Sequence, residues 1–348
     1  MTAIVDLRSD TVTQPTTAMR DAMMTALLGD DVFGDDPSVN HLQNTIADLL
    51  GFDAALFVSS GTQSNLCAIL SHCQRGDEYI VGQFAHCYRW EGGGAAVFGS
   101  VQPQPLQHQA DGTIALEDIE AAIKPDDAHF ARTRLLALEN TIGGKLLPFS
   151  YLQQATQLAK GKGLATHLDG ARLFNAATAQ ATLTGGDVRR EAQRISGCFD
   201  SVSVCLSKGL GAPVGSVLCG GHDFIARAHR IRKMAGGGMR QAGILAAAGT
   251  YALDFHVDRL SKDHALAQRL AEGLAGIPDL QVEAPHSNIL FVDLVDSAKA
   301  RSAELIQYLK LRGILVTGLY RLRFVTHLDV DAAGIDRTIE AITKFFGV

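Results

Sequence analysis

The sequence predicts an α/β protein with a large, mostly parallel seven-stranded sheet and a smaller α+β domain at its C-terminal end. The chain has 348 residues, more than the roughly 250–300 at which a single hydrophobic core stops growing. Short apolar runs recur between residues 50 and 221, and most are separated by segments long enough for a helix. The pattern changes after about residue 250. We therefore predict a large domain at 1–250 and a small C-terminal domain at 251–348.

The strands of the large sheet are expected where apolar residues run almost without interruption, which is typical of strands buried on both faces. They are Ala54–Ser59, Glu78–Val81, Ala95–Phe98, Arg134–Glu139, Leu164–Leu168, Ser201–Leu206 and Gly215–Cys219. Helical periodicity lies between or beside them at Ser64–His72, Leu116–Ile123 and Tyr151–Lys160. A further helix is expected after an N-cap at Ser38, with Leu42, Ile46 and Leu49 on one face.

The C-terminal part combines helical and strand patterns. It contains a long amphipathic stretch from Asp258 to Ala275, a strand over residues 288–294, a helix at Ala303–Leu311, a strand near Ile314–Val316 and a final helix. No low-complexity linker precedes it, so we expect a continuous helix, rather than a flexible tether, at the domain boundary.

Composition excludes several classes of protein. With 47% hydrophobic and 20% charged residues, the chain is neither disordered nor a coiled coil. Its net charge is −6, and no run of basic residues is long enough to follow nucleic acid. Its apolar stretches are shorter than the roughly 20 residues of a membrane span, and its first residues do not resemble a targeting signal.

The six cysteines have no C-x-x-C spacing. We interpret them as free thiols of a cytoplasmic protein, with no disulfide framework and no zinc or other metal site. Glycine is more frequent than average, at 35 residues. This excess predicts many turns, or places where the backbone approaches a ligand closely.

Lys208 ends an apolar strand, inside a turn rich in glycine. A lysine in this position is partly desolvated, which favours the neutral amine that forms a Schiff base with a carbonyl. A strand-end lysine that simply extends to solvent explains this segment equally well.

The next signal is Asp169, which a buried strand places at its carboxyl end, with Arg172 shortly after it. Ligands of open α/β sheets bind outside these strand ends. An acidic residue there suits pyridoxal phosphate, whose ring nitrogen needs an acidic partner so that the ring can accept electrons. An Asp-Gly pair alone is more often a turn, but a strand-Asp followed by a strand-Lys is more specific.

A third segment, Phe57–Asn65, is an apolar strand that breaks at Ser60-Gly61-Thr62 and continues into a helix. Backbone N–H groups at a helix N-terminus form an anion site suited to a cofactor phosphate. Taken alone the segment is also an ordinary N-cap, and it lacks the P-loop and dinucleotide-binding fingerprints.

These three segments in this order resemble the fold-type I, aspartate-aminotransferase-like enzymes that depend on pyridoxal phosphate. Longer motifs narrow the resemblance to the L-threonine aldolases, almost from end to end. They are Asp6–Thr13, Gly29–Pro37, His167–Ala176, Lys233–Gln241 and Arg323–Asp329. The resemblance implies a lyase of threonine catabolism that cleaves L-threonine, L-allo-threonine and related β-hydroxy-α-amino acids to glycine and an aldehyde.

The resemblance also implies which residues bind the cofactor. Lys208 would bind it covalently and Asp169 would contact its ring nitrogen. The phosphate would be bound by Gly61, Thr62 and Ser207.

Substrate contacts are implied in the same way. Arg172 would lie near the cofactor's phenolic oxygen and the substrate carboxylate, which Ser9 and Arg323 would bind. His86 matches a histidine that stacks on the cofactor ring, and His129 one near the substrate hydroxyl. Residue types leave open whether a histidine or a water accepts the hydroxyl proton.

Lys233 and Arg240 match positions that reach a neighbouring subunit's phosphate site, and the family implies a homotetramer built as a dimer of dimers. The sequence departs from the family at Phe33, where a tyrosine is usual, and at Ile142-Gly143, where His-Asn is usual. Both differences concern the aldehyde part of the substrate or stereochemistry, and neither concerns the reaction class.

Three alternatives stay open at this stage. One is an aldolase that prefers phenylserine, or another fold-type I lyase. A second is a folate-dependent activity of the serine hydroxymethyltransferase type. A non-catalytic protein that binds pyridoxal phosphate is disfavoured, because a carrier would need only the cofactor contacts.

Overall fold

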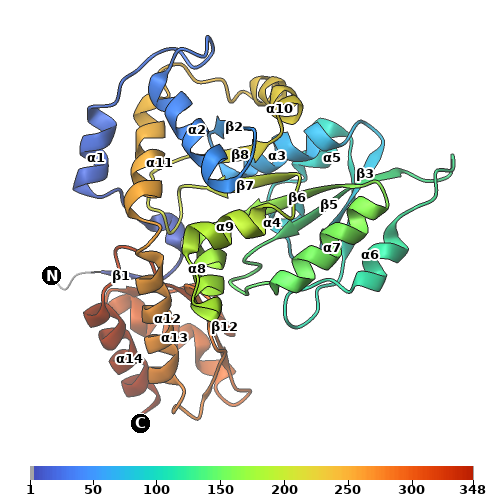
Figure 1. The fold of residues 1–348 in the computed structure, drawn as a ribbon. Helices are drawn as coiled ribbons and strands as arrows, with labels where there is room; N and C mark the ends of the chain where they lie inside the picture. The colour runs from blue at the N-terminus through green and yellow to red at the C-terminus, as the bar shows by residue number, and fades with distance from the viewer. Residues whose placement is uncertain (1–3, 348) are drawn as a thin grey trace.

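The computed structural model describes residues 4–347 (Figure 1). Its centre is a seven-stranded sheet of order β2-β8-β7-β6-β5-β3-β4. The strands are β2 (Ala54–Val58), β3 (Asp77–Gly82), β4 (Gln102–Leu106), β5 (Arg132–Glu139), β6 (Ala165–Gly170), β7 (Ser201–Cys205) and β8 (Ser216–Gly220). All run parallel except β8, which is antiparallel to both of its neighbours. The predicted α/β fold class is confirmed.

Both faces of this sheet are covered by helices. The helices are α1 (Thr17–Met24), α2 (Pro37–Leu50), α3 (Gly61–His72), α4 (His86–Arg89), α5 (Gly94–Gly99), α6 (Leu116–Ala122), α7 (Phe149–Gly161), α8 (Leu173–Thr184), α9 (Val188–Ser196), α10 (His222–Met234) and α11 (Gly243–Phe255). In β5, Leu136 and Leu138 pack in the core that includes α2, α7 and α9, whereas Leu135 and Ala137 face the side of α3. Apolar residues on both sides explain the uninterrupted runs in the sequence.

Two strand predictions differ from the structure. Ala95–Phe98 forms part of helix α5, in which Ala95 is buried and Val97 and Phe98 point to solvent. The strand missed by the sequence is β4, which contains Pro103 and Pro105. Proline cannot donate to a ladder hydrogen bond, but β4 is the edge strand and pairs only with β3.

The N-cap of α2 also differs from the prediction. Asp36 occupies that position, and its Oδ1 accepts hydrogen bonds from the backbone N–H groups of Ser38 at 3.1 Å and Val39 at 3.0 Å. Pro37 is the first residue of the helix, where its missing N–H costs nothing. The cap therefore precedes Pro37, and the predicted cap Ser38 lies inside the helix.

The C-terminal part has its own core. A three-stranded antiparallel sheet of order β12-β10-β9 packs with three helices, and Figure 1 shows it beside the large sheet. Its elements are β9 (Leu280–Val282), β10 (Ile289–Leu294), β12 (Arg321–Val325), α12 (Leu260–Leu274), α13 (Ser302–Leu311), which the short 3-10 helix η2 (Lys299–Arg301) precedes, and α14 (Ala332–Phe346). Another 3-10 helix, η1 (Asp10–Val12), lies near the start of the chain. The predicted boundary at 250/251 lies inside the continuous helix α11, and a turn at 256–259 separates this helix from α12. The division into two domains stays a prediction.

The beginning of the chain joins this C-terminal part. Strand β1 (Val5–Asp6) pairs in parallel with β11 (Ile314–Leu315), and Val5 and Leu7 are buried in the C-terminal core. The N-terminal residues thereby lie where the two parts of the molecule meet. Within residues 4–347, no helix is long and apolar enough to cross a membrane.

Candidate active site

The residues predicted for the site come together at one edge of the large sheet. Gly61 follows β2, His86 follows β3 and Lys208 follows β7. Asp169 is the second-to-last residue of β6. Because these strands are parallel, their carboxyl ends lie at the same edge. The sequence positions alone therefore account for most of the constellation.

Asp169 is almost completely buried and its carboxylate is held by two N–H donors. Asn65 Nδ2 donates to Oδ2 at 2.8 Å, and the backbone N–H of Ala171 donates to Oδ1 at 3.0 Å. The next residue, Gly170, lies so close to β7 that a Cβ there would be 2.6 Å from the carbonyl oxygen of Ser203. Only glycine fits beside Asp169 at this point of the sheet.

Further acidic groups surround Asp169. Glu91 Oε1 accepts hydrogen bonds from Asn65 Nδ2 at 2.8 Å and contacts His86 Nδ1 at 2.8 Å. The backbone N–H of His86 donates to Glu139 Oε2 at 2.7 Å. Among residues 4–347, no lysine or arginine forms an ion pair with any of these three carboxylates. We call Asp169, Glu91, Glu139, His86 and Asn65 the acid-rich cluster.

The charges of this cluster shift one another's pKa values. The hydrogen bond that His86 donates to Glu91 raises the pKa of His86. Burial, together with the nearby Asp169 charge, raises the pKa of both Glu91 and Glu139. The cluster therefore lacks a cation that would balance its carboxylates, and a cation placed against Asp169 would be stabilised.

A second cluster has more cationic side chains than carboxylates. Arg172 forms a bidentate ion pair with Asp10, with Nε at 2.8 Å from Oδ2 and Nη2 at 2.7 Å from Oδ1. Asn288 Nδ2 also donates to Asp10 Oδ2, at 3.2 Å. Burial opposes ionisation of Asp10, but the Arg172 guanidinium outweighs it and lowers the pKa of that carboxyl.

Arg323 on β12 adds a cation without a carboxylate partner. Its Nη1 donates to the backbone oxygen of Arg8 at 3.2 Å, and it forms no ion pair within the described part of the chain. Burial, and then the Arg172 charge, lower its pKa. Ser9 lies beside Arg8, and its Oγ accepts a hydrogen bond from the N–H of Thr11 at 3.3 Å. We call Arg172, Arg323, Asp10, Asn288 and Ser9 the cation-rich cluster.

Lys208 lies between the two clusters. Its charge acts on Asp10 in the cation-rich cluster and on both Glu139 and His86 in the acid-rich one. The lysine is half-buried, so its amine is accessible from the space that both clusters face.

The start of α3 offers a site for an anion. Neither the Gly61 nor the Thr62 N–H has a hydrogen-bond partner among residues 4–347. The buried Ser216 Oγ also has none, and it lies 3.7 Å from where a Cβ on Gly61 would be. The predicted Ser207 is half-buried beside Lys208, with its Oγ 3.5 Å from Cys205 Sγ. These free donors fit a phosphate group.

The structure does not bring His129 to this edge. Its side chain is 87% exposed and its Nδ1 lies 2.6 Å from Asp127 Oδ1. It precedes β5, so it lies at the amino end of a strand whose carboxyl end carries Glu139. Within one chain, His129 and Lys208 are therefore on opposite edges of the sheet, contrary to the expected placement.

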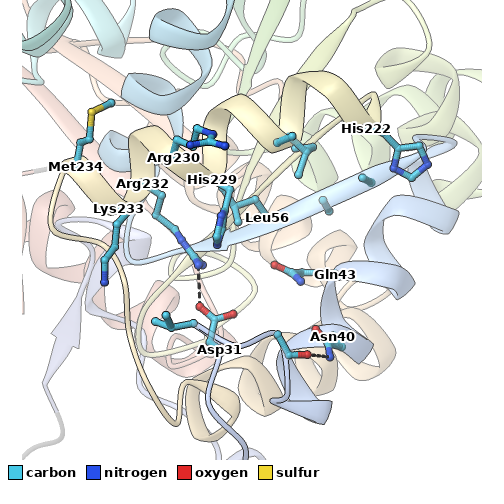
Figure 2. Close-up of a pocket in the computed structure, with 16 residues that line it drawn as sticks. Asp31, Asn40, Gln43, Leu56, His222, His229, Arg230, Arg232, Lys233 and Met234 are labelled. Atoms are coloured by element: carbon cyan, nitrogen blue, oxygen red, sulfur yellow. Dashed lines mark hydrogen bonds and ion pairs between the residues drawn. The ribbon is translucent and has the colours of Figure 1, made fainter.

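Lys233 lies on α10, which packs against β2, and Arg240 lies in the loop between α10 and α11. Lys233 lines a cavity of about 1020 Å³ between α2, α10 and the 31–34 turn, and Figure 2 shows it near the ion pair of Arg232 with Asp31. Arg240 Nη1 lies 3.3 Å from Asp30 Oδ2. Neither side chain contacts the two clusters within the chain.

Sequence reasoning missed Asn65, Glu91, Asp10 and Asn288. One signal was present for Glu91, because three glycines follow it directly. Gly92 and Gly93 have φ values of +62° and +69°, which only glycine adopts easily. They turn the chain between Glu91 and α5, and so fix the carboxylate beside His86.

Comparison with known proteins places this geometry in a family. Residues 6–297 match the beta-eliminating lyases. The chain is 53% identical to the low-specificity L-threonine aldolase of Escherichia coli K12 over 330 residues, which cover 94% of this chain and 95% of that protein. The chain belongs to the beta-eliminating lyase family. Another relative, a probable low-specificity L-threonine aldolase of Arabidopsis thaliana, is 43% identical and covers 98% of this chain and 97% of its own.

The fold of this beta-eliminating lyase is also found in solved structures. A threonine aldolase of Leishmania major superposes with a TM-score of 0.82 at 22% identity, covering 99% of this chain and 100% of that one. The donor set fits the cofactor that the sequence implies. A half-buried amine, a buried carboxylate without a cation and a helix N-terminus with free N–H groups match the aldehyde, ring nitrogen and phosphate of pyridoxal phosphate.

Proposed function

We propose that this chain is a pyridoxal-phosphate-dependent aldehyde-lyase that cleaves L-threonine, L-allo-threonine and related β-hydroxy-α-amino acids to glycine and an aldehyde. The observation that carries the proposal is the pairing of an acid-rich and a cation-rich cluster at one sheet edge, with Lys208 between them. The 53% identity to a low-specificity L-threonine aldolase supports the same activity.

Three groups of this chain would hold the cofactor. Lys208 would bind its aldehyde carbon, Asp169 its ring nitrogen, and the N-terminus of α3 its phosphate. When bound, pyridoxal phosphate supplies an electron sink for the breaking Cα–Cβ bond. Asp169 would keep a proton on the ring nitrogen, because a negative charge beside it favours the cationic form of the ring.

Other residues orient the substrate and move a proton. Arg323, together with Arg172, would bind the substrate carboxylate, since a guanidinium group binds a carboxylate through paired N–H donors. Glu91 holds a proton at His86 Nδ1, which leaves Nε2 free as an acceptor. Nε2 would take the hydroxyl proton directly or orient a water that takes it.

The replacement Lys208→Ala tests this assignment. We expect threonine cleavage, measured as released acetaldehyde, to fall at least about a thousandfold, and the absorbance of lysine-bound cofactor to disappear. Lys160→Ala, a change to a lysine on the surface of α7, is the control and should leave both readings unchanged. Normal glycine release by purified Lys208→Ala would overturn the proposal.

We further propose that the active form is a homo-oligomer, a dimer of dimers, in which His129 and Lys233 reach a neighbouring subunit's site. Their positions away from Lys208 support this arrangement. Mixing Lys208→Ala subunits with Lys233→Ala subunits tests it. Activity should reappear in the mixture, because some interfaces then combine an intact Lys208 with an intact Lys233, and a mixture without activity would contradict the arrangement.

A second candidate is a preference for aromatic substrates such as phenylserine. A cavity of about 800 Å³ beside the site is lined by Phe84, Trp90 and Phe291 and reaches Ile142-Gly143, where the family has His-Asn. Comparing kcat/KM for L-threonine, L-allo-threonine and phenylserine decides between the two. A phenylserine value well above both threonine values would favour the aromatic substrate, and dependence on added folate would favour neither.

For the location of the protein we propose the cytoplasm. All six cysteines are free and five of them are buried, as is usual in a reducing compartment. Cell fractionation with an antibody tests this.

A further inference from the structure

Asn65 connects the two carboxylates that face the cofactor site. It lies in the second turn of α3 and is 2% exposed. Its Nδ2 donates to Asp169 Oδ2 and Glu91 Oε1, each at 2.8 Å. An amide nitrogen carries two hydrogens, and here both are given to carboxylates. The orientation of the amide is thereby fixed, with its oxygen turned away from the site.

That oxygen faces a buried histidine. Asn65 Oδ1 lies 3.2 Å from His167 Nε2. Burial, with the nearby His72, lowers the pKa of His167 to about 3, so the ring is neutral and has one N–H. Since an amide oxygen can only accept, that hydrogen is on Nε2.

The same reasoning continues away from the site. His167 Nδ1 then carries a lone pair and accepts the hydroxyl hydrogen of Ser201, whose Oγ lies at 2.9 Å. Ser201 Oγ in turn accepts from His72 Nε2, at 2.7 Å. Every donor in this chain points toward Asp169 and Glu91, and reversing any one of them would leave a buried donor or acceptor without a partner.

We propose that Asn65 is the positioning residue that fixes the Asp169 carboxylate against the cofactor ring nitrogen, and that the buried chain of His72, Ser201 and His167 fixes Asn65. Asp169 and Glu91 lie within 4.8 Å of each other and of His86. Without the shared amide the two carboxylates would repel each other at close range in a buried site. This inference rests on the proposed role of Asp169 in binding pyridoxal phosphate.

A cofactor analogue separates positioning from general support of the fold. We would titrate the cofactor-free protein, followed by tryptophan fluorescence and absorbance, with pyridoxal phosphate and with the analogue that has C–H in place of the ring nitrogen. In Asn65→Ala, pyridoxal phosphate should bind about 10- to 100-fold more weakly, the usual range for a lost hydrogen bond to a charged group. The affinity for the analogue should change little, because it has no ring nitrogen for Asp169 to contact.

Three further variants complete the test. Asn65→Leu keeps the approximate size of the side chain and removes its donors without adding a charge, so it should show the same selective loss even if Asn65→Ala fails to fold. Ser71→Ala, which removes a buried hydrogen bond of the same helix far from Asp169, should leave both affinities unchanged. His167→Phe should reproduce the selective loss to a smaller extent.

Equal weakening of both ligands by Asn65→Ala and Asn65→Leu, or no weakening, would overturn the role of Asn65. A wild-type protein that binds both ligands equally would overturn the assignment of Asp169, and this inference with it. If threonine is not cleaved but the selective loss is found, the proposed function fails and the role of Asn65 stands.

Discussion

The two clusters at the sheet edge differ in the sign of the charge that each leaves unbalanced. In the acid-rich cluster, Asp169, Glu91 and Glu139 surround a single imidazole. In the cation-rich cluster, Arg172 and Arg323 face a single carboxylate, Asp10. Their members are partly or fully buried, so solvent screens each imbalance less than it would at the surface.

The difference indicates what each cluster binds. A protonated ring nitrogen supplies the cation that the first cluster lacks, and an amino-acid carboxylate supplies the anion that the second lacks. Binding of both ligands therefore removes the charge imbalance on each side of Lys208. Four replacements test this comparison, beginning with the largest expected effect.

Breaking the ion pair of the cation-rich cluster has the largest expected effect. Arg172→Ala leaves the fully buried Asp10 without its partner, which costs about 3–5 kcal/mol of unfolding free energy. In the wild type the pKa of Asp10 is lowered, so this pair contributes stability above the unfolded pKa and loses it as the pH falls through the folded pKa. In the variant, stability instead decreases as the pH rises.

Urea unfolding at several pH values measures the effect of Arg172→Ala. The double variant Arg172→Ala/Asp10→Asn is the matched control, because it removes the unpaired charge and should recover most of the lost stability. A double variant no more stable than Arg172→Ala would show that charge is not the cause.

Removing the unpaired cation should affect binding instead of stability. Arg323→Ala is expected to lower kcat/KM for threonine about 10- to 100-fold, mainly through KM, because the substrate carboxylate loses charged hydrogen bonds. Arg321→Ala is the control on the same strand, since Arg321 pairs with Glu283 and Asp293. Equal effects of the two changes would contradict a special role of Arg323.

In the acid-rich cluster, Glu91→Gln removes a charge and keeps an acceptor for His86 Nδ1. Glu91 raises the pKa of His86, so the variant should have a lower His86 pKa. The neutral ring is the form that accepts a proton, so the acid limb of the pH–activity profile should move to lower pH, and the plateau should fall about tenfold because the base is weaker. NMR titration of His86 measures the pKa directly, and an unchanged acid limb would exclude His86 as the titrating group.

The spacing of apolar residues predicted the elements that are buried on defined faces. Strand β5 has apolar residues on both faces and was predicted almost to its ends. Strand β4, with two prolines, and helix α5, with its apolar residues turned to solvent, follow no such pattern. Their structure depends on which element ends the sheet and which small residues fit against α3, and a single sequence does not contain that information.

The residues of the site also differ in whether the sequence predicts them. Asp169 and Lys208 were predicted because strand ends can be recognised in the sequence, and these ends meet at one edge. The roles of Asn65 and Glu91 arise only when residues far apart in the sequence come within hydrogen-bond distance. An asparagine inside a helix has no distinctive pattern of its own, and the glycines after Glu91 indicate a turn without showing what its carboxylate contacts.

The smallest expected effect tests whether net charge or hydrogen bonding dominates in the cation-rich cluster. Ser9→Ala removes a neutral hydroxyl, worth about 1 kcal/mol, so KM for threonine should rise only about fivefold. The same hydroxyl caps the short helix η1, so Ser9→Thr, which keeps the cap, is the control and should restore KM. If Ser9→Ala raised KM more than Arg323→Ala did, the Ser9 hydroxyl rather than the unbalanced charge would select the substrate carboxylate. The opposite charges of the two clusters would then no longer explain what each cluster binds.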